Sequence, residues 1–406
     1  MKTSAQRVEG TRAGGRAAAW LILAVLLLFS IAAPLNQFKV PPIMPVLMDA
    51  LGLSVSGAGM LMSVFAITGL ILALPSGLIF QKAGVRLTGN LAGGSILIGA
   101  VLGALSTSTG GLLASRVIEG IGTSFMAVLA PAIIAQWFVA RRRGTAMGIW
   151  ATWVPIGTAA MLLIAPTLAQ AAGWRAVWWF GAGYALVVTV LYLVFVRPAP
   201  AKTTDVAEPG AAAPGHSITS AQVLRNRTIW LLAAAFGAFC MAAVGLGTYM
   251  PTFLNAERGL PLAQAALISS IPTIITIFSA PAGGALSDRI GSRKKPYLAG
   301  MAAAIILLPL TGALSGAWLI VLVVVSGLAL GIVPTNIFAA AVEAAGDERQ
   351  GGMAMAVIMV GQNAGMLLGP LVFGALAEGS GWPAAFASLA VMSALGLLAG
   401  WRAKAR

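Results

Sequence analysis

The sequence predicts an all-α integral membrane protein with twelve transmembrane helices, arranged as two six-helix repeats around a central cavity. Three observations indicate this fold: the chain is apolar throughout, its apolar runs match the thickness of a bilayer, and its two halves resemble one another. Of the 406 residues, 59% are hydrophobic and only 9% are charged, whereas a soluble domain carries roughly 25% charged residues. So few charges could not cover a water-facing surface.

Twelve apolar runs follow one another along the chain, each close to or above the roughly 20 residues that a helix needs to cross a bilayer. The first six lie near residues 17–48, 55–80, 88–107, 110–138, 144–170 and 174–196. The other six lie near residues 228–253, 262–286, 296–314, 317–341, 351–377 and 383–401. A polar segment rich in Ala and Pro separates the two sets and is typical of a flexible linker. We therefore expect an N-terminal half (1–196), a linker (197–227) and a C-terminal half (228–406).

The first run is too long for the apolar part of a signal peptide and is interpreted as a retained helix. The distribution of the 25 Lys and Arg residues then gives the orientation. Nearly all lie in the termini, in the linker or in alternate loops, and the opposite loops hold only Arg175 and Arg258. This positive-inside pattern predicts a multi-pass protein of the bacterial inner membrane with both termini in the cytoplasm. The net charge of +14 thus indicates contact with anionic lipid and no nucleic-acid partner.

Several classes of chemistry lack their residues. The chain has one cysteine, Cys240, which excludes a metal-binding cysteine cluster. Its one histidine, His216, lies in the most polar stretch of the chain, which argues against a zinc site and a Ser-His-Asp triad. A phosphate-binding GxxxxGK[ST] loop is absent from the sequence, which argues against ATP as the energy source. We expect no enzyme activity, no cofactor and no metal.

The two halves repeat in sequence. "GLIFQKAGVR" (77–86) matches "GALSDRIGSR" (284–293) at a shift of 207 residues. This shift, or one of 208, also pairs Gly52 with Gly259, Gly120 with Gly327, Arg141 with Arg349, Gly173 with Gly381 and Trp174 with Trp382. Two six-helix halves of the same orientation imply an axis along the membrane normal with a cavity between the halves.

Several motifs resemble those of the major facilitator superfamily. "GALSDRIGSRKK" (284–295) resembles its loop signature G-x-x-x-D-R-x-G-R-R and departs from it at Ser292. "RVIEGIG" (116–122), "WFVARRRGTAMG" (137–148) and the "GWR" at 173–175 are similar to its other motifs. "NQFKVPPIMP" (36–45) resembles the first helix of cyanate-transporter-like members. The resemblance implies that helices 1, 4, 7 and 10 line the cavity and that the halves alternate between two openings.

The resemblance also implies a cytoplasmic gate. The loop after the eighth helix would lie against the start of the fifth, where Asp288 accepts hydrogen bonds from the exposed helix N-terminus. Arg289 and Arg293 would bind neighbouring carbonyls or acids. In the first half the positions of Asp288 and Arg293 hold Gln81 and Arg86, and the neutral Gln81 predicts a weaker latch. The alternative is that these basic residues only set the orientation of the protein in the membrane.

Two cations, Lys39 and Arg116, lie inside predicted spans. With a first helix running to about Leu47, both would lie roughly 9–12 Å from the outer ends of their helices. Glu119 follows Arg116 by one turn and can pair with it, which leaves one positive charge in excess. Intramembrane charges commonly mark a substrate or ion path, so we predict a site for a small anion, with Glu119 as the proton carrier. Alternatively, Lys39 snorkels to the interface and Arg116–Glu119 is structural.

Prolines after Lys39 are expected to kink or unwind the first helix at this site and to free backbone groups. Further candidate substrate contacts are polar or aromatic residues in or beside the spans, each equally compatible with helix packing. They are Asn36, Trp153, Tyr249, Asn336, Gln362 and Asn363.

The predicted function is secondary active transport of a small organic or inorganic anion by alternating access, with a proton as the coupling ion. One alternative is a proton-antiport exporter of hydrophobic compounds. The fifth predicted helix, "GIWATWVPIGTAAM" (148–161), lacks the G-x-x-x-G-P-x-x-G pattern that such exporters often carry. A second alternative is a membrane sensor or scaffold that transports nothing, although the linker is too short to fold as an output domain.

Overall fold

A computed structural model describes the chain except for residues 1–3, 74, 139, 197–219, 347–349 and 405–406. Twelve stretches of the described chain are helical, long and apolar enough to cross a membrane. The predicted all-α fold with twelve spans is therefore confirmed. Most of the predicted linker lies outside the described residues, and its last part forms the short helix α9 (Ser220–Arg225).

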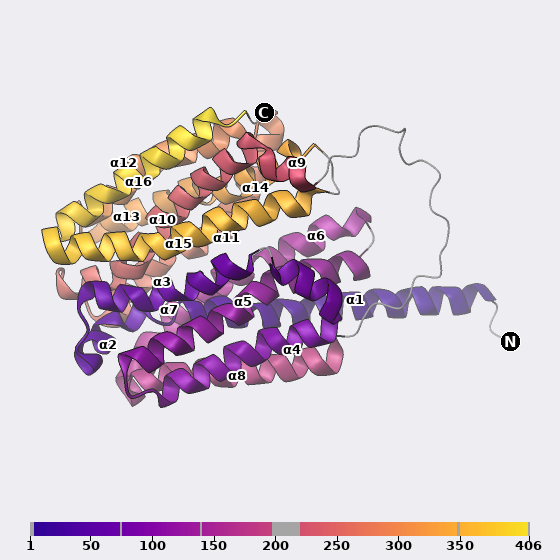
Figure 1. Cartoon of the computed structure of the whole chain (residues 1–406), viewed down its shortest axis with the longest axis horizontal. Coiled ribbons are helices and arrows are strands. Elements are labelled where there is room, and N and C mark those ends of the chain that lie inside the picture. Colours follow the sequence, from indigo (N-terminus) through magenta and orange to yellow (C-terminus); the bar gives the residue numbers. More distant parts are fainter. Residues whose placement is uncertain (1–3, 74, 139, 197–219, 347–349, 405–406) are drawn as a thin grey trace.

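Six spans make up the first half of the chain (Figure 1). Their elements are α1 (Ser4–Gln37), η1 (Pro41–Ile43), α2 (Met44–Leu51), α3 (Val55–Leu72), α4 (Pro75–Leu105), α5 (Thr109–Trp137), α6 (Ala140–Ala151), α7 (Trp153–Ala172) and α8 (Trp174–Phe195). After α9 the second half contains α10 (Arg227–Ala256), α11 (Leu262–Ile290), α12 (Lys294–Ala313), α13 (Gly316–Leu330), α14 (Ile332–Ala344), α15 (Gly351–Ser380) and α16 (Trp382–Arg402).

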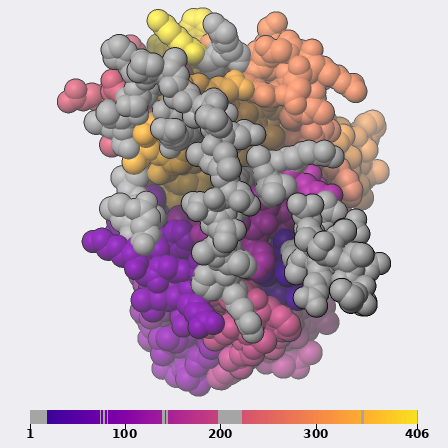
Figure 2. Space-filling view, turned by 90° about the vertical axis from the view of Figure 1, so that its right-hand side faces the viewer, coloured from indigo at the N-terminus to yellow at the C-terminus, as the bar shows by residue number. Residues whose placement is uncertain are grey.

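The two sets of helices form two layers that lie one above the other (Figure 1). Helices α3 and α15 pack together across the layers, as do α7 and α11, and η1 packs on α10. We call the end of the bundle that carries α9 and the start of α10 the linker end, and Figure 2 views the molecule from that end. The opposite end, which carries α2, is the distal end.

The backbone repeats as the sequence predicts. Gly52 and Gly259 both adopt a positive φ, of 62° and 66°. Gly173 and Gly381 do so as well, with φ/ψ of 77°/168° and 84°/167°. Residues other than glycine rarely adopt a positive φ, so the paired glycines permit the same turns between helices in both halves.

The first helix departs from the expectation that it runs to about Leu47. α1 ends at Gln37, and the chain then forms a turn and the short 3-10 helix η1 before helical geometry resumes in α2. Pro41 has no N–H, so the carbonyl of Gln37 lacks the donor that a continuous helix would supply at position i+4. The predicted unwinding beside Lys39 is therefore present. In the second half, α10 continues as one helix from Arg227 to Ala256.

Candidate functional site

Three charged side chains meet inside the N-terminal layer. Arg116 and Glu119 lie three residues apart on α5 and share one face of that helix. Lys39 reaches them from the turn between α1 and η1. We call these three residues the charged triad.

A single carboxylate joins both cations. Lys39 Nζ lies 2.5 Å from Glu119 Oε1, and Arg116 Nη1 lies 2.6 Å from Glu119 Oε2. All three side chains are 0% exposed. The predicted Arg116–Glu119 pair is present, and Lys39 shares its carboxylate, so the three side chains carry one positive charge in excess. Lys39 does not snorkel to a surface, because it points into the protein to reach Glu119.

The break in the first helix supplies acceptors for Arg116. Arg116 Nη1 donates to the carbonyl of Asn36 and Nη2 to that of Gln37, both at 2.6 Å. Nε donates to the carbonyl of Leu61 on α3 at 3.0 Å. The Gln37 carbonyl is the one that Pro41 leaves without a helical donor. Arg116 therefore ties together the end of α1, the middle of α3 and α5, and its position is fixed by several hydrogen bonds.

Lys39 is held by fewer bonds. Besides Glu119, its ammonium donates to Asn36 Oδ1 at 3.2 Å and lies 4.6 Å from the centre of the Trp178 ring on α8. The Asn36 amide nitrogen in turn donates to Ala32 O at 2.9 Å and to the Gly181 carbonyl of α8 at 3.4 Å. Asn36 thus orients the lysine in this conformation. Lys39 therefore has fewer hydrogen-bond partners than Arg116 and a more flexible stem.

Two aromatic residues of the site were missed from sequence. The Trp178 ring faces Lys39, and the Phe65 ring of α3 lies 4.7 Å from Arg116 Cζ. Each cation therefore has an aromatic face as well as the shared carboxylate, an arrangement that stabilises desolvated cations. Neither residue carries a sequence signal for this role, because each comes from a helix whose rotation is set by packing.

Glycines on α4 permit the close approach of α5 and α8. A Cβ on Gly99 would lie 2.6 Å from Glu119 Cγ and 2.8 Å from the Ser115 carbonyl. A Cβ on Gly103 would overlap the Trp178 indole. Side chains larger than hydrogen at these positions would therefore push the carboxylate and the indole out of place.

The other predicted substrate contacts lie on other elements and have other partners. Trp153 on α7 is half-buried and stacks on Trp150 with ring centres 5.5 Å apart. Asn336 on α14 is buried and donates to the carbonyls of Ile332 (2.8 Å) and Gly283 (3.4 Å).

On α15, the half-buried Asn363 donates to the Met359 carbonyl at 2.8 Å and lies against Gly69 of α3. The neighbouring Gln362 has one weak contact to a described residue, 3.8 Å from Nε2 to Met366 Sδ. Tyr249 lies near the distal end, where its hydroxyl contacts both layers.

The predicted gating residues lie at the linker end. Asp288 Oδ1 binds Arg293 Nη1 at 2.5 Å, and Arg293 Nε binds Glu343 Oε1 of α14 at 2.9 Å. Hydrogen bonds to Glu343 and to Asp288 raise the pKa of the Arg293 guanidinium above its ordinary value. Arg86 and Arg289 are exposed. The side chain of Gln81 lies outside the described part of the structure, and the contact of Asp288 with the start of α6 stays a prediction.

Twelve candidate membrane spans among the described residues, in two repeated halves with a charged cluster buried among the first six, define a polytopic membrane protein. The sequence model of the Major Facilitator Superfamily matches residues 20–353 and 318–405. The chain belongs to this superfamily.

Individual relatives are distant. The chain is 28% identical over 250 residues to a hexuronate transporter of Bacillus subtilis, a match that covers 61% of this chain and 59% of that one. It is 26% identical over 289 residues to a "Probable sulfoacetate transporter" of Cupriavidus necator, which covers 67% and 66% of the two chains. Each match therefore spans less than two thirds of the relative's own length.

A solved structure shows the same fold. It is that of a bacterial homologue of the human lysosomal transporter Spinster, in an inward-facing and unoccupied conformation, with a TM-score of 0.79. The match covers 95% of this chain and 97% of that one at 17% sequence identity, so the likeness concerns the fold alone.

Proposed function

We propose that the protein is a secondary active transporter of a small organic anion, and that the charged triad is its binding and coupling site. The observation that carries this proposal is the sharing of one buried carboxylate by Lys39 and Arg116. Two cations and one carboxylate leave a formal charge of +1 in a desolvated place. A buried excess positive charge attracts an anion, and we infer that this anion is the substrate.

Arg116 and Lys39 have different roles in this proposal. Arg116 is held by three backbone carbonyls and Glu119, so it keeps the site in shape. Lys39 exchanges its partner: in the empty site it binds Glu119, and in the loaded site it binds the carboxylate or sulfonate of the substrate. Glu119 loses this contact when a proton neutralises it, because a neutral carboxyl attracts the ammonium far less.

Equal net charge of the empty and the loaded site couples the proton to the anion. The empty site carries two cations and an ionised Glu119. The loaded site carries two cations, a protonated Glu119 and a monoanion, and its formal charge is again +1. The empty and the loaded protein therefore carry the same charge when they switch between the two openings. Binding of a proton alone, or of an anion alone, would change this charge in the low-dielectric interior. This equality favours symport of one proton with one monoanion.

The relatives support an organic anion, because hexuronates carry a carboxylate and sulfoacetate carries a carboxylate and a sulfonate, either of which matches Lys39. The balance of one proton with one monoanion applies to a hexuronate. Polar groups of the second half would contact the rest of such a substrate. Among the described residues, Gln362 has only its weak contact with Met366, and the buried Asn336 Oδ1 has no hydrogen-bond partner. We propose that these two amide side chains form hydrogen bonds with hydroxyl groups of the substrate.

The proposal places both termini in the cytoplasm, with the two halves, 1–196 and 228–406, as the moving bodies. Asp288, Arg293 and Glu343 then lie at the cytoplasmic side. Their ion pairs lie within the second half, so closure of the linker end would come from the predicted contact of Asp288 with the start of α6 in the first half.

A ligand-stabilisation screen tests the function. Purified protein is heated with glucuronate, sulfoacetate, a neutral hexose or a lipophilic cation, and a ligand that binds the folded state raises Tm. We expect stabilisation by the acids and none by the hexose. Stabilisation by the lipophilic cation alone would favour an exporter of hydrophobic compounds. Absence of flux of every solute in proteoliposomes would favour a sensor or scaffold.

A further inference from the structure

We propose that Glu378 and Tyr249 form a latch with the first turn of α3, and that this latch holds the distal end of the protein closed. Both latch side chains belong to the second half of the chain, on α15 and α10, whereas α3 belongs to the first. The proposal rests on the alternating-access part of the proposed function and not on the identity of the substrate.

The charged part of the latch is a helix cap supplied by the opposite half. Glu378 Oε2 accepts a hydrogen bond from the backbone N–H of Ser56 at 2.9 Å. Ser56 lies in the first turn of α3, where N–H groups lack helical partners and the helix carries a partial positive charge. The next N–H, that of Gly57, is capped within the same half by Ser54 Oγ at 3.2 Å. One helix start is therefore completed by both halves together.

The place of Glu378 on its own helix adds a preference for the closed state. It lies in the last turn of α15, which ends at Ser380, and an acidic side chain is unfavourable at the negative end of a helix. The α3 N-terminus offsets this repulsion only while the two halves are in contact. When the distal end opens, Glu378 loses that contact and stays beside its own helix end.

Tyr249 forms the buried part of the latch. Its hydroxyl lies 3.1 Å from the carbonyl oxygens of both Val55 on α3 and Pro370 on α15, and its side chain is 0% exposed. Glycines make room for the ring: a Cβ on Gly59 or on Gly374 would lie within 2.9 Å of Tyr249 Cζ. The tyrosine hydroxyl thus connects α3, α10 and α15 at one point.

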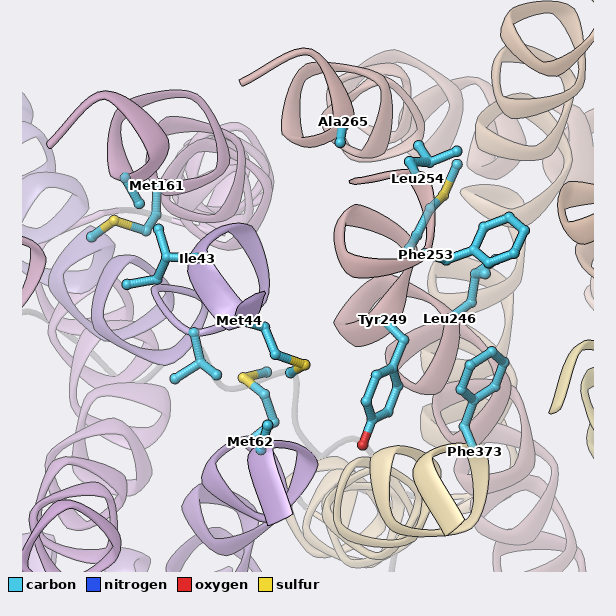
Figure 3. Close-up of a cluster of buried hydrophobic side chains, with 14 of the residues drawn as sticks. Ile43, Met44, Met62, Met161, Leu246, Tyr249, Phe253, Leu254, Ala265 and Phe373 are labelled. Atoms are coloured by element: carbon cyan, nitrogen blue, oxygen red, sulfur yellow. The ribbon is translucent and has the colours of Figure 1, made fainter. Parts of the chain in front are cut away.

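Tyr249 belongs to an apolar cluster to which both halves contribute. Met44 and Met62 of the first half and Phe253 and Phe373 of the second belong to one buried cluster (Figure 3). Tyr249 stacks on Phe373 with ring centres 5.3 Å apart. A path between the distal end and the interior would have to separate these side chains, so opening requires the latch to break.

The latch is one-sided. At the repeat shifts of 207 and 208, Ser56 corresponds to Ala263 at the start of α11, and Glu378 corresponds to Gln170 near the end of α7. The equivalent pair across α11 and α7 therefore has no carboxylate. Closure of the distal end depends on α3 and α15 more than on the symmetry-related pair.

Distance measurements across the distal end test the latch. Thr107 and Ser380 are exposed positions of the two halves at this end, and Cys240 is the only native cysteine. Spin labels are attached to Thr107→Cys and Ser380→Cys in a Cys240→Ala background. Pulsed electron paramagnetic resonance in nanodiscs without substrate then measures the distance between the labels, which increases when the distal end opens. Tyr249→Phe and Glu378→Gln should each raise the long-distance population at least twofold, and the double variant should raise it further.

Glu257→Gln is the matched control, because Glu257 is exposed at the same end but accepts from Trp382 Nε1 within its own half. It should leave the distances unchanged. Glu378→Gln alters an exposed side chain and keeps the test valid if Tyr249→Phe does not fold. Unchanged distances in Glu378→Gln and in every folded Tyr249 variant would overturn the latch. Because no substrate is added, this result is independent of whether anions bind the triad.

Discussion

Lys39 and Glu119 lie 80 positions apart in the sequence, yet their charged ends form a fully buried ion pair, with 2.5 Å between Nζ and Oε1. Arg116 occupies the second oxygen of the same carboxylate. Removing one partner of a buried ion pair commonly costs about 3–5 kcal/mol, because the other charge is left without compensation. Each member of the triad should therefore respond differently to substitution.

Glu119→Gln should uncouple transport from the proton gradient. The neutral amide imitates the protonated carboxyl, so Lys39 stays available for the anion. We expect exchange of labelled substrate across proteoliposomes to persist, while uphill accumulation driven by a pH gradient is lost. Uphill accumulation by the variant would refute the coupling role.

Arg116→Lys should destabilise the protein more than Lys39→Gln does. An ammonium cannot reach the carbonyls of Asn36, Gln37 and Leu61 at once, since it lacks the planar fork of guanidinium. Loss of two or more charge-assisted hydrogen bonds, each worth about 1.5–3 kcal/mol, should lower Tm measured on purified protein. Equal Tm values for the two variants would contradict the anchoring role of Arg116.

Pro41→Ala should weaken the site without touching a charged residue. It restores an N–H that can bind the Gln37 carbonyl in a continuous helix, in competition with Arg116 Nη2. We expect apparent substrate affinity to fall about tenfold, the equivalent of one charge-assisted hydrogen bond. Pro45→Ala is the control, because Pro45 lies in the first turn of α2, where a missing N–H costs little. The same affinity in both variants would argue against the carbonyl mechanism.

Asp288→Asn should weaken closure of the linker end. Labels on Lys82→Cys and Lys295→Cys, both exposed positions, would report the separation of the halves there. Glu343→Gln removes the other acidic partner of Arg293 and separates two roles. If Asp288 also binds the start of α6, only Asp288→Asn should lengthen the distances. Identical distance changes in the two variants would restrict Asp288 to its ion pair with Arg293.

The spans and the repeat could be predicted from the sequence. Hydrophobicity marks the spans, and glycines that permit positive φ recur at equivalent positions of the two halves. The Arg116–Glu119 pair could also be predicted, since residues three apart share a helix face. The bridge to Lys39 could not be predicted. Its position depends on where the first helix unwinds, and the depth estimate assumed a continuous helix to about Leu47, whereas α1 ends at Gln37.

The aromatic partners depended on tertiary packing. Trp178 and Phe65 face the cations because glycines on α4 let α5 and α8 approach and because Arg116 binds α3. Helix rotation of this kind is set by neighbours and leaves no local pattern. The same holds for Glu378, whose partner Ser56 lies 322 positions away.

Binding and transport of glucuronate and sulfoacetate by Lys39→Gln test the central claim most directly. Glutamine keeps length and hydrogen bonding but removes the charge, and Lys82→Gln, the same change at an exposed position, is the control. The account predicts that Lys39→Gln folds, loses tenfold or more in apparent affinity for both acids, and keeps its distal-end distances. Wild-type affinity and flux in Lys39→Gln would contradict the proposal that Lys39 binds the transported anion.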